Sequence, residues 1–140
     1  MNIDRFSIKL KEAVEGLTNA TLQVGFINDA TYPTGQKVAA VAFYNEFGTS
    51  KIPARPFFRR MIASENPNWG EKLNGVLKAT GYDLNQSLSM LGMDIEGALR
   101  QSIIDTNDPP NSVATIAKKG FNNPLIDTSV MIKSITSEVK

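Results

Sequence analysis

The sequence predicts an α+β fold in which a small antiparallel sheet packs against one long helix and several shorter helices. The strongest observation is an apolar seam that recurs at helical spacing between residues 84 and 103. Two short stretches, 21–27 and 135–139, instead alternate apolar and polar side chains, which is typical of half-buried strands. The chain has 140 residues, the size of one domain, so we expect residues 1–140 to share a single core.

The first predicted helix spans residues 4–17, with Asp4 near its start. Four apolar side chains recur there at three- and four-residue steps and share one face: Phe6, Leu10, Val14 and Leu17. The strand 21–27 follows, and its apolar side chains point the same way: Leu22, Val24 and Phe26. Both elements are therefore expected to turn an apolar face to the core.

Residues 28–37 contain Asn, Asp, Pro and Gly and predict a loop. An alanine-rich helix is expected over 36–47, and Gly48 is well placed to end it in a left-handed conformation. Its buried side chains are expected to be Val38, Val41 and Ala42. Residues 49–56 are predicted to be extended, because a residue before proline avoids the helical conformation.

Three helices are predicted between residues 57 and 105. Pro56 suits the first position of a short helix over 57–63, and Asn66-Pro67 repeats that start signal for a second helix, which Gly81 ends. The second helix carries an apolar stripe of Trp69, Leu73, Val76 and Leu77. Asp83 and Gln86 resemble a capping box for the third helix, whose seam extends over about six turns and consists of Leu84, Leu88, Leu91, Ile95, Leu99 and Ile103.

The C-terminal quarter predicts little helix and one strand. The proline pair after residue 105 breaks the long helix, and single helical turns are expected within 112–124 and 126–133, the latter beginning near Asp127 or Thr128. The strand 135–139 is expected to pair with the strand 21–27. Because two strands alone are marginally stable, a third short strand is expected, either within 28–35 or from a partner subunit.

The composition excludes several classes of function. The chain has no histidine and no cysteine. The commonest zinc, iron and copper ligands and any Ser-His or Cys-His nucleophile are therefore missing, and no cofactor is predicted.

The net charge of +1 creates no strong overall attraction to DNA or to an anionic membrane. No run approaches the roughly 18 apolar residues of a membrane span, and the charged N-terminus does not resemble a signal peptide. The glycines match no phosphate-binding motif, and Gly92 and Gly97 predict close helix packing.

The carboxylates offer few catalytic candidates. Asp94 and Glu96 lie two residues apart on a helix and point to different faces. Asp105 and Asp108 flank a helix end, where solvated side chains are common. A hydrolase that uses carboxylates alone, for instance one that cuts cell-wall glycans, is an open alternative that requires two acids roughly 5 to 10 Å apart in a cleft.

Residues 44–60 contain an unusual concentration of aromatics, prolines and basic side chains. The basic residues are Lys51, Arg55, Arg59 and Arg60, and the only acid in the segment is Glu46. One interpretation is a nucleic-acid-binding module that contacts phosphates through residues 51–60. A second interpretation buries Phe57, Phe58 or both in the core and leaves the arginines solvated. A third, which we favour, is a protein interface, because arginine and aromatics are enriched at interfaces and a stiff loop loses little entropy on docking.

The interface interpretation assigns specific roles to two side chains. An exposed Phe57 would contribute roughly 1.5 to 3 kcal/mol when a neighbour buries it, and Arg55, held between two prolines, would pair with a partner's carboxylate. The predicted interface residues are Ile52, Pro53, Arg55, Pro56, Phe57, Arg59 and Arg60.

Two sequence blocks carry a resemblance to a known family. The first is Asn-Glu-Phe-Gly over 45–48, followed by Ile-Pro-Ala-Arg-Pro-Phe over 52–57, and the second is Pro-Leu-Ile-Asp-Thr and a Ser-Ile strand within 124–135. They resemble the small tail-completion or neck proteins of tailed bacteriophages, and the order of elements is similar from about residue 20 to residue 140. The chain departs from the family at Ser129, where glycine is usual, and in lacking a Trp-Pro-Leu block.

The resemblance implies a structural virion protein without enzymatic activity. Such proteins form homo-oligomeric rings, six- or twelve-fold, which join a DNA-filled head to a tail or complete the head-proximal end of the tail. The implied partners are further copies of the chain and other neck and tail proteins of the phage, while genomic DNA passes through the ring without specific binding. The implied location is the virion, after synthesis in the host cytoplasm, with no membrane partner.

Overall fold

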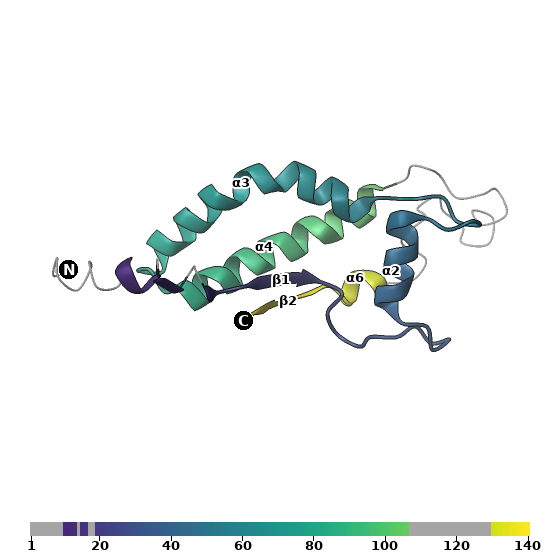
Figure 1. Ribbon diagram of the computed structural model, residues 1–140, viewed down its shortest axis with the longest axis horizontal. Coiled ribbons are helices and arrows are strands. Elements are labelled where there is room, and N and C mark those ends of the chain that lie inside the picture. The colour runs from purple at the N-terminus through teal and green to yellow at the C-terminus, as the bar shows by residue number, and fades with distance from the viewer. Residues whose placement is uncertain (1–9, 14, 17–18, 107–129) are drawn as a thin grey trace.

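A computed structural model of the chain describes residues 10–13, 15–16, 19–106 and 130–140. The architecture is α+β, as predicted: a two-stranded antiparallel sheet and further helices surround a long central helix (Figure 1). In chain order, the elements are β1 (Leu22–Gly25), α2 (Val38–Phe47), α3 (Phe57–Ala79), α4 (Leu84–Asp105), α6 (Val130–Lys133) and β2 (Thr136–Val139).

Helix α4 forms the centre of the fold, and Figure 1 shows it running between α3 and the sheet. Its start is capped as predicted, because the Asp83 carboxylate accepts a hydrogen bond from the Gln86 amide at 3.0 Å. Leu84 is half-buried. The rest of the predicted seam is buried: Leu88, Leu91, Ile95, Leu99 and Ile103. The long helix and its inward face are therefore confirmed.

The two glycines of α4 have different surroundings. A Cβ atom on Gly92 would lie 2.8 Å from Ser137 Oγ and 3.1 Å from Leu22 Cδ1, so this glycine lets the sheet, rather than another helix, approach α4. A Cβ atom on Gly97 would meet no atom within 4 Å. The predicted helix packing is therefore wrong at both positions.

The sheet consists of the two predicted strands. Strands β1 and β2 pair antiparallel, with Leu22 opposite Val139 and Gly25 opposite Thr136. The third strand expected within 28–35 is wrong, because residues 28–37 form a loop closed by a single bridge between Thr31 and Lys37. The turn-forming residues of this stretch outweigh its few strand-forming ones. The other predicted source of a third strand, a partner subunit, stays a prediction.

Pro67 lies inside α3, where the sequence predicted a new helix. Helix α3 runs without interruption from Phe57 to Ala79, so the two predicted helices are one. A proline removes one helical hydrogen bond and bends the helix, and Figure 1 shows α3 arched along α4. Burial of Met61 before the proline and Leu77 after it compensates for the lost bond. Pro56 is the residue before the first turn of α3 rather than its first member.

Helix α2 starts two residues later than predicted, since Gln36 and Lys37 belong to the preceding loop. Its predicted inner side chains are buried or half-buried: Val38, Val41 and Ala42. The helix ends at Gly48, whose φ of 77° is a positive value that glycine adopts without steric cost.

The ends of the chain are described in part. Residues 10–13 and 15–16 of the predicted helix 4–17 are helical. Ala13 is buried, whereas Leu10, which was expected to face the core, is exposed, so the prediction for Leu10 is wrong. Helix α6 is the helical turn predicted within 126–133. Several expectations lie outside the described residues: Asp4, Phe6, Val14, Leu17, Asp127, Thr128 and the turn within 112–124.

Candidate assembly interface

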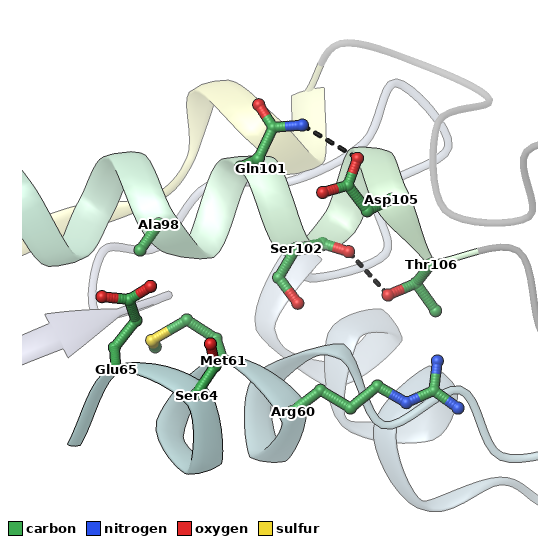
Figure 2. Close-up of a pocket in the computed structure, with 9 residues that line it drawn as sticks. All are labelled: Arg60, Met61, Ser64, Glu65, Ala98, Gln101, Ser102, Asp105 and Thr106. Carbon is green, nitrogen blue, oxygen red and sulfur yellow. Dashed lines mark hydrogen bonds between the residues drawn. The ribbon is translucent and has the colours of Figure 1, made fainter. Parts of the chain in front are cut away.

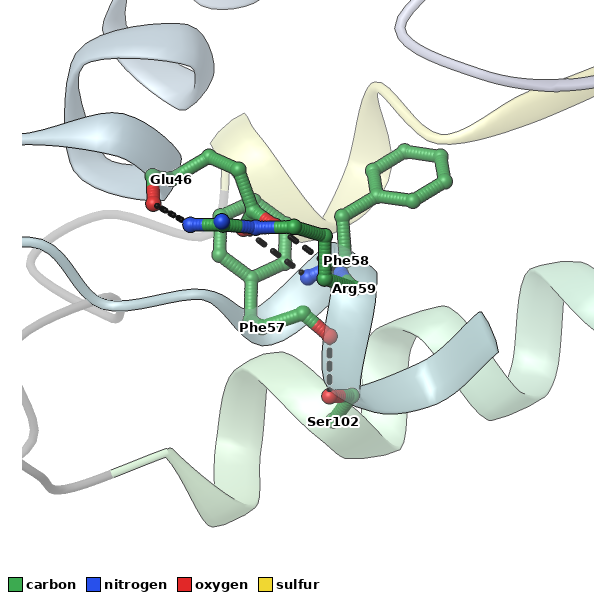
Figure 3. Close-up of polar contacts among 5 residues, drawn as sticks. All are labelled: Glu46, Phe57, Phe58, Arg59 and Ser102. Atoms are coloured by element: carbon green, nitrogen blue, oxygen red, sulfur yellow. Dashed lines mark hydrogen bonds and ion pairs between the residues drawn. The ribbon is translucent and has the colours of Figure 1, made fainter. Parts of the chain in front are cut away.

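Phe57 belongs to the core of its own chain. Its side chain is 0% exposed, and its ring packs edge to face against Phe26 with centroids 6.3 Å apart. Ser102 of α4 donates a hydrogen bond to the Phe57 carbonyl at 2.6 Å, which joins the start of α3 to α4 (Figure 3). The prediction that Phe57 is exposed and docks into a neighbour is therefore wrong. Sequence reasoning missed this because two adjacent phenylalanines leave open which one the helix turns inward.

Arg55 is also enclosed by its own chain. Only 7% of its surface is exposed, and burial lowers the pKa of its guanidinium below the usual value for arginine. Its amide donates to the Asn45 carbonyl at 2.6 Å, and its carbonyl accepts from the Phe57 amide at 2.8 Å across Pro56. The backbone therefore turns tightly here, and the predicted pairing of Arg55 with a partner's carboxylate at an exposed loop tip is wrong.

Glu46 organises the corner between α2 and α3. Glu46 is 5% exposed, and its carboxylate accepts hydrogen bonds from the amides of Phe58 at 3.1 Å and Arg59 at 2.9 Å. These amides belong to the first turn of α3 and have no partner within that helix, and a negative charge at a helix N-terminus is favourable. Glu46 thus caps α3 from outside, a role that sequence reasoning did not assign.

Arg59 closes the same corner from the other side. Its Nε lies 3.2 Å from the Glu46 carboxylate, and its Nη2 donates to the Glu46 carbonyl at 2.9 Å (Figure 3). Its guanidinium carbon lies 4.8 Å from the centre of the Phe47 ring, which is within range of a cation–π contact. Arg59 therefore joins α3 to the C-terminal turn of α2, and it remains partly exposed at the surface.

The loop that connects α2 and α3 is folded tightly. The Thr49 hydroxyl accepts from the amides of Lys51 at 3.2 Å and Ile52 at 3.0 Å. A Cβ atom at position 48 would lie 2.9 Å from the Ala54 amide nitrogen, so Gly48 is needed for this close approach. Ile52 and Pro53 are exposed at the tip. Of the predicted interface residues, Ile52, Pro53, Arg59 and Arg60 are thus accessible, Pro56 is half-buried, and Arg55 and Phe57 are buried.

Three aromatic side chains of α2 lie exposed beside this loop. Phe43 is 59% exposed, Tyr44 45% and Phe47 54%. The rings contact one another, with centroids 4.8 Å apart for Phe43 and Phe47 and 6.2 Å apart for Phe43 and Tyr44. We call this surface the α2 aromatic face. The pattern of residues 36–47 predicted only a buried side for this helix, so the α2 aromatic face was not expected.

A groove of about 400 Å³ runs between the α2 aromatic face and the start of α3. Its lining includes Phe43, Phe47, Phe58 and Ile62. Ile62, like the aromatics of α2, is exposed. A helix that is apolar on its outer side as well as its inner side is typical of a helix with a binding partner.

The structure does not gather the four basic residues of 51–60 into one free cationic surface. Arg55 is buried, and Arg59 pairs with Glu46. Lys51 belongs to the loop, whereas Arg60 belongs to helix α3. This arrangement does not favour a continuous phosphate-binding row.

A shallow cleft between α3 and α4 contains two carboxylates, Glu65 and Asp105 (Figure 2). Figure 2 shows them at opposite ends of the cleft lining. Asp105 accepts from the Gln101 amide group at 2.9 Å, and Glu65 lies 3.4 Å from Lys72 Nζ. Each carboxylate is therefore held by a neighbour, and the pair is not directed at a common point.

Two other carboxylates considered for catalysis also have cationic neighbours. Asp94 lies 2.8 Å from Lys72 Nζ, and Glu96 lies 3.8 Å from Arg100 Nη2. The hydrogen bond to Asp94 raises the pKa of Lys72 above its usual value.

Within the described residues, no group of three or more acids is placed to hold a metal ion. No helix in this part of the chain has both the length and the apolar character needed to cross a membrane.

Comparison with models of known protein families, with curated proteins and with solved structures finds no match to this chain.

Proposed function

We propose that the protein is a structural virion component of a tailed bacteriophage, which assembles into a ring in the neck and joins head to tail or completes the head-proximal end of the tail. The α2 aromatic face carries the proposal. Monomeric proteins rarely expose contiguous apolar surface without a function, and aromatic side chains are enriched at protein interfaces. The proposal moves the interface from the buried Phe57 to the α2 aromatic face and the loop tip at Ile52 and Pro53.

The resemblance of 45–48 and 52–57 to neck and tail-completion proteins supports the same proposal, because these residues build the corner just described. Glu46 and Arg59 fix α2 against α3, and Gly48 allows the loop to fold back. A surface held rigid in this way loses little conformational entropy when a partner covers it. The segments 45–48 and 52–57 would then be needed to present an interface rather than to provide every contact.

A ring requires one surface of each subunit to meet a different surface of the next subunit. We assign the α2 aromatic face and the loop tip to one side of this contact. Phe43 and Phe47 are 59% and 54% exposed, so a partner that covers them would gain, for each side chain, about half of the 1.5–3 kcal/mol of full burial. This is enough for two substitutions in the face to prevent assembly.

The test compares two variants with matched exposed positions. Phe43→Ser together with Phe47→Ser should abolish rings in sedimentation velocity and electron microscopy while leaving the unfolding midpoint of the subunit nearly unchanged. Met93→Ser is the control, because Met93 is 68% exposed but lies on α4, and this variant should assemble normally.

Mass spectrometry of virions from the phage that encodes the chain provides the second measurement, since assembly can require the portal or tail as a template. A wild-type protein that is both monomeric in solution and missing from virions would contradict the proposal. Rings that persist in the double variant would show that the α2 aromatic face is not the interface.

A further inference from the structure

We infer that the free edge of β1 and the groove beside it bind an extended segment of another protein, which adds a third strand to the sheet. This inference goes beyond the proposed ring, because it concerns a second groove, which shares only Phe58 and Ile62 with the first, and a partner that ring formation does not require.

The hydrogen-bond pattern of the sheet shows which backbone groups are free. Thr21 and Lys140 exchange two backbone hydrogen bonds at 2.8 Å. Bonded and non-bonded pairs alternate along an antiparallel ladder, so Leu22 and Val24 occupy its non-bonded positions. Their amides and carbonyls point away from β2 and meet no backbone partner in the described part of the chain. The edge of β1 therefore offers the donors and acceptors that an added strand needs.

A groove of about 340 Å³ lies along this edge. Strand β1 and helix α3 form its walls, and α4 forms its floor; its lining includes Leu22, Val24, Phe58, Ile62, Trp69 and Leu91. Figure 1 shows β2 on the side of β1 away from α3, so the groove and the free edge are on the same side of β1. An added strand would insert every second side chain into this apolar lining, because side chains alternate along a strand.

Trp69 provides an independent indication of a ligand. Its indole Nε1 is shielded from solvent and has no hydrogen-bond acceptor within the described residues. Buried tryptophan N–H groups usually have a partner, and one left without a partner is costly. A peptide that displaces the side chains now covering the indole would bring a carbonyl group to this N–H and supply the missing acceptor.

The size of the groove favours a single extended chain as the occupant. Strand β1 has four residues, so its free edge is about 13 Å long. A stable contact between two folded proteins buries about 800 Å² on each partner, which is more than this short edge and its groove offer. A helix is disfavoured because it satisfies its own backbone groups and would leave the edge of β1 unpaired. We therefore assign the groove to an extended segment of another protein with apolar side chains at alternate positions.

The experiment screens a library of displayed random nonapeptides for binding to the wild-type protein. Enriched peptides should carry apolar residues at alternate positions. Trp69 is the only tryptophan of the chain, so its fluorescence should change when such a peptide binds. The amides of Leu22 and Val24 should exchange hydrogen rapidly in the free protein and slowly with the peptide, whereas the Gln23 amide, which faces β2, should be protected in both states.

Two variants locate the binding site. Val24→Pro removes an amide that faces the groove without removing a bond to β2, and should weaken the binding of the enriched peptide at least tenfold. Trp69→Phe keeps an aromatic side chain but removes the N–H donor. Calorimetry should show that this variant binds the peptide with about fivefold lower affinity. Met93→Ser should change the affinity less than twofold.

Three results with peptides would overturn the inference: no enriched peptide, an enriched peptide that leaves the Leu22 and Val24 amides unprotected, or full affinity of that peptide for both the Trp69→Phe and the Val24→Pro variants. If Val24→Pro does not fold, Trp69→Phe and the exchange data still decide the outcome. Protection that rises with protein concentration alone would identify a second copy as the occupant and contradict the assignment to another protein. The outcome is separate from that of the ring, because the variants at Phe43 and Phe47 should still bind the peptide.

Discussion

Helix α4 and the α2–α3 corner are stabilised in different ways. In α4, apolar side chains at a regular spacing face the core, and each buried residue contributes a similar kind of contact. At the corner, one carboxylate on α2 holds two amides and a guanidinium of α3 across 12 or 13 residues of sequence. The stability of α4 is spread over many equivalent positions, whereas that of the corner depends on a few contacts that have no substitute.

This difference has a consequence for the surface. Because Glu46 and Phe57 supply the buried contacts of the corner, Phe43 and Phe47 remain largely exposed and are available to a partner. In α4, the same separation exists between Leu99, which is buried, and Met93, which is exposed. Exposure rather than residue type distinguishes the apolar side chains that stabilise the fold from those that can bind.

The largest expected effect separates two phenylalanines of the corner. Phe57→Ala should lower the free energy of unfolding by about 3–5 kcal/mol, because it leaves a cavity in the core. Phe43→Ala should change it by no more than about 0.5 kcal/mol, because that ring is mostly exposed. Urea denaturation of both variants provides the measurement. Similar losses in the two variants would show that the corner does not divide into a buried and an exposed set.

The next effect concerns the carboxylate that caps α3. Glu46→Ala should lower the free energy of unfolding by about 2–3 kcal/mol, since it leaves two helix amides and the Arg59 Nε without the carboxylate that accepts from them. Glu15→Ala is the control, because Glu15 forms an exposed pair with Lys11 at 4.0 Å, and should cost less than about 0.5 kcal/mol. Thermal and urea unfolding of both variants provide the measurement. If Glu46→Ala loses no more unfolding free energy than Glu15→Ala, the corner is held by apolar packing alone.

The smallest effect compares the two glycines of α4. Gly92→Ala should lower the free energy of unfolding by about 1–2 kcal/mol, because the added methyl group would contact Ser137 and Leu22. Gly97→Ala should raise it by about 0.5–1 kcal/mol, since alanine favours the helix and the space is open. Calorimetric melting temperatures should shift in opposite directions. A shift in the same direction for both would contradict the close approach of the sheet to α4.

Local pattern was sufficient for the elements whose signal repeats. The seam of α4 recurs at each turn, so its helix and its buried face followed from spacing, and Asp83 marked its start. The two strands followed from alternation, and their pairing followed because the chain offered one clear partner for each. Pro67 shows the limit of this reasoning: a start signal that is valid in isolation was overridden by the burial of Met61 and Leu77 on either side of it.

The corner required the tertiary structure. Glu46, Arg55 and Phe57 were visible as members of an unusual segment, but their burial depends on how α3 meets α2 and α4, which no local period encodes. The same is true of the α2 aromatic face, since a helix that is apolar all round does not indicate which side the core will cover. Sequence determined which residues form helices and strands because those preferences are local; the packing of these elements decided which apolar side chains remain outside.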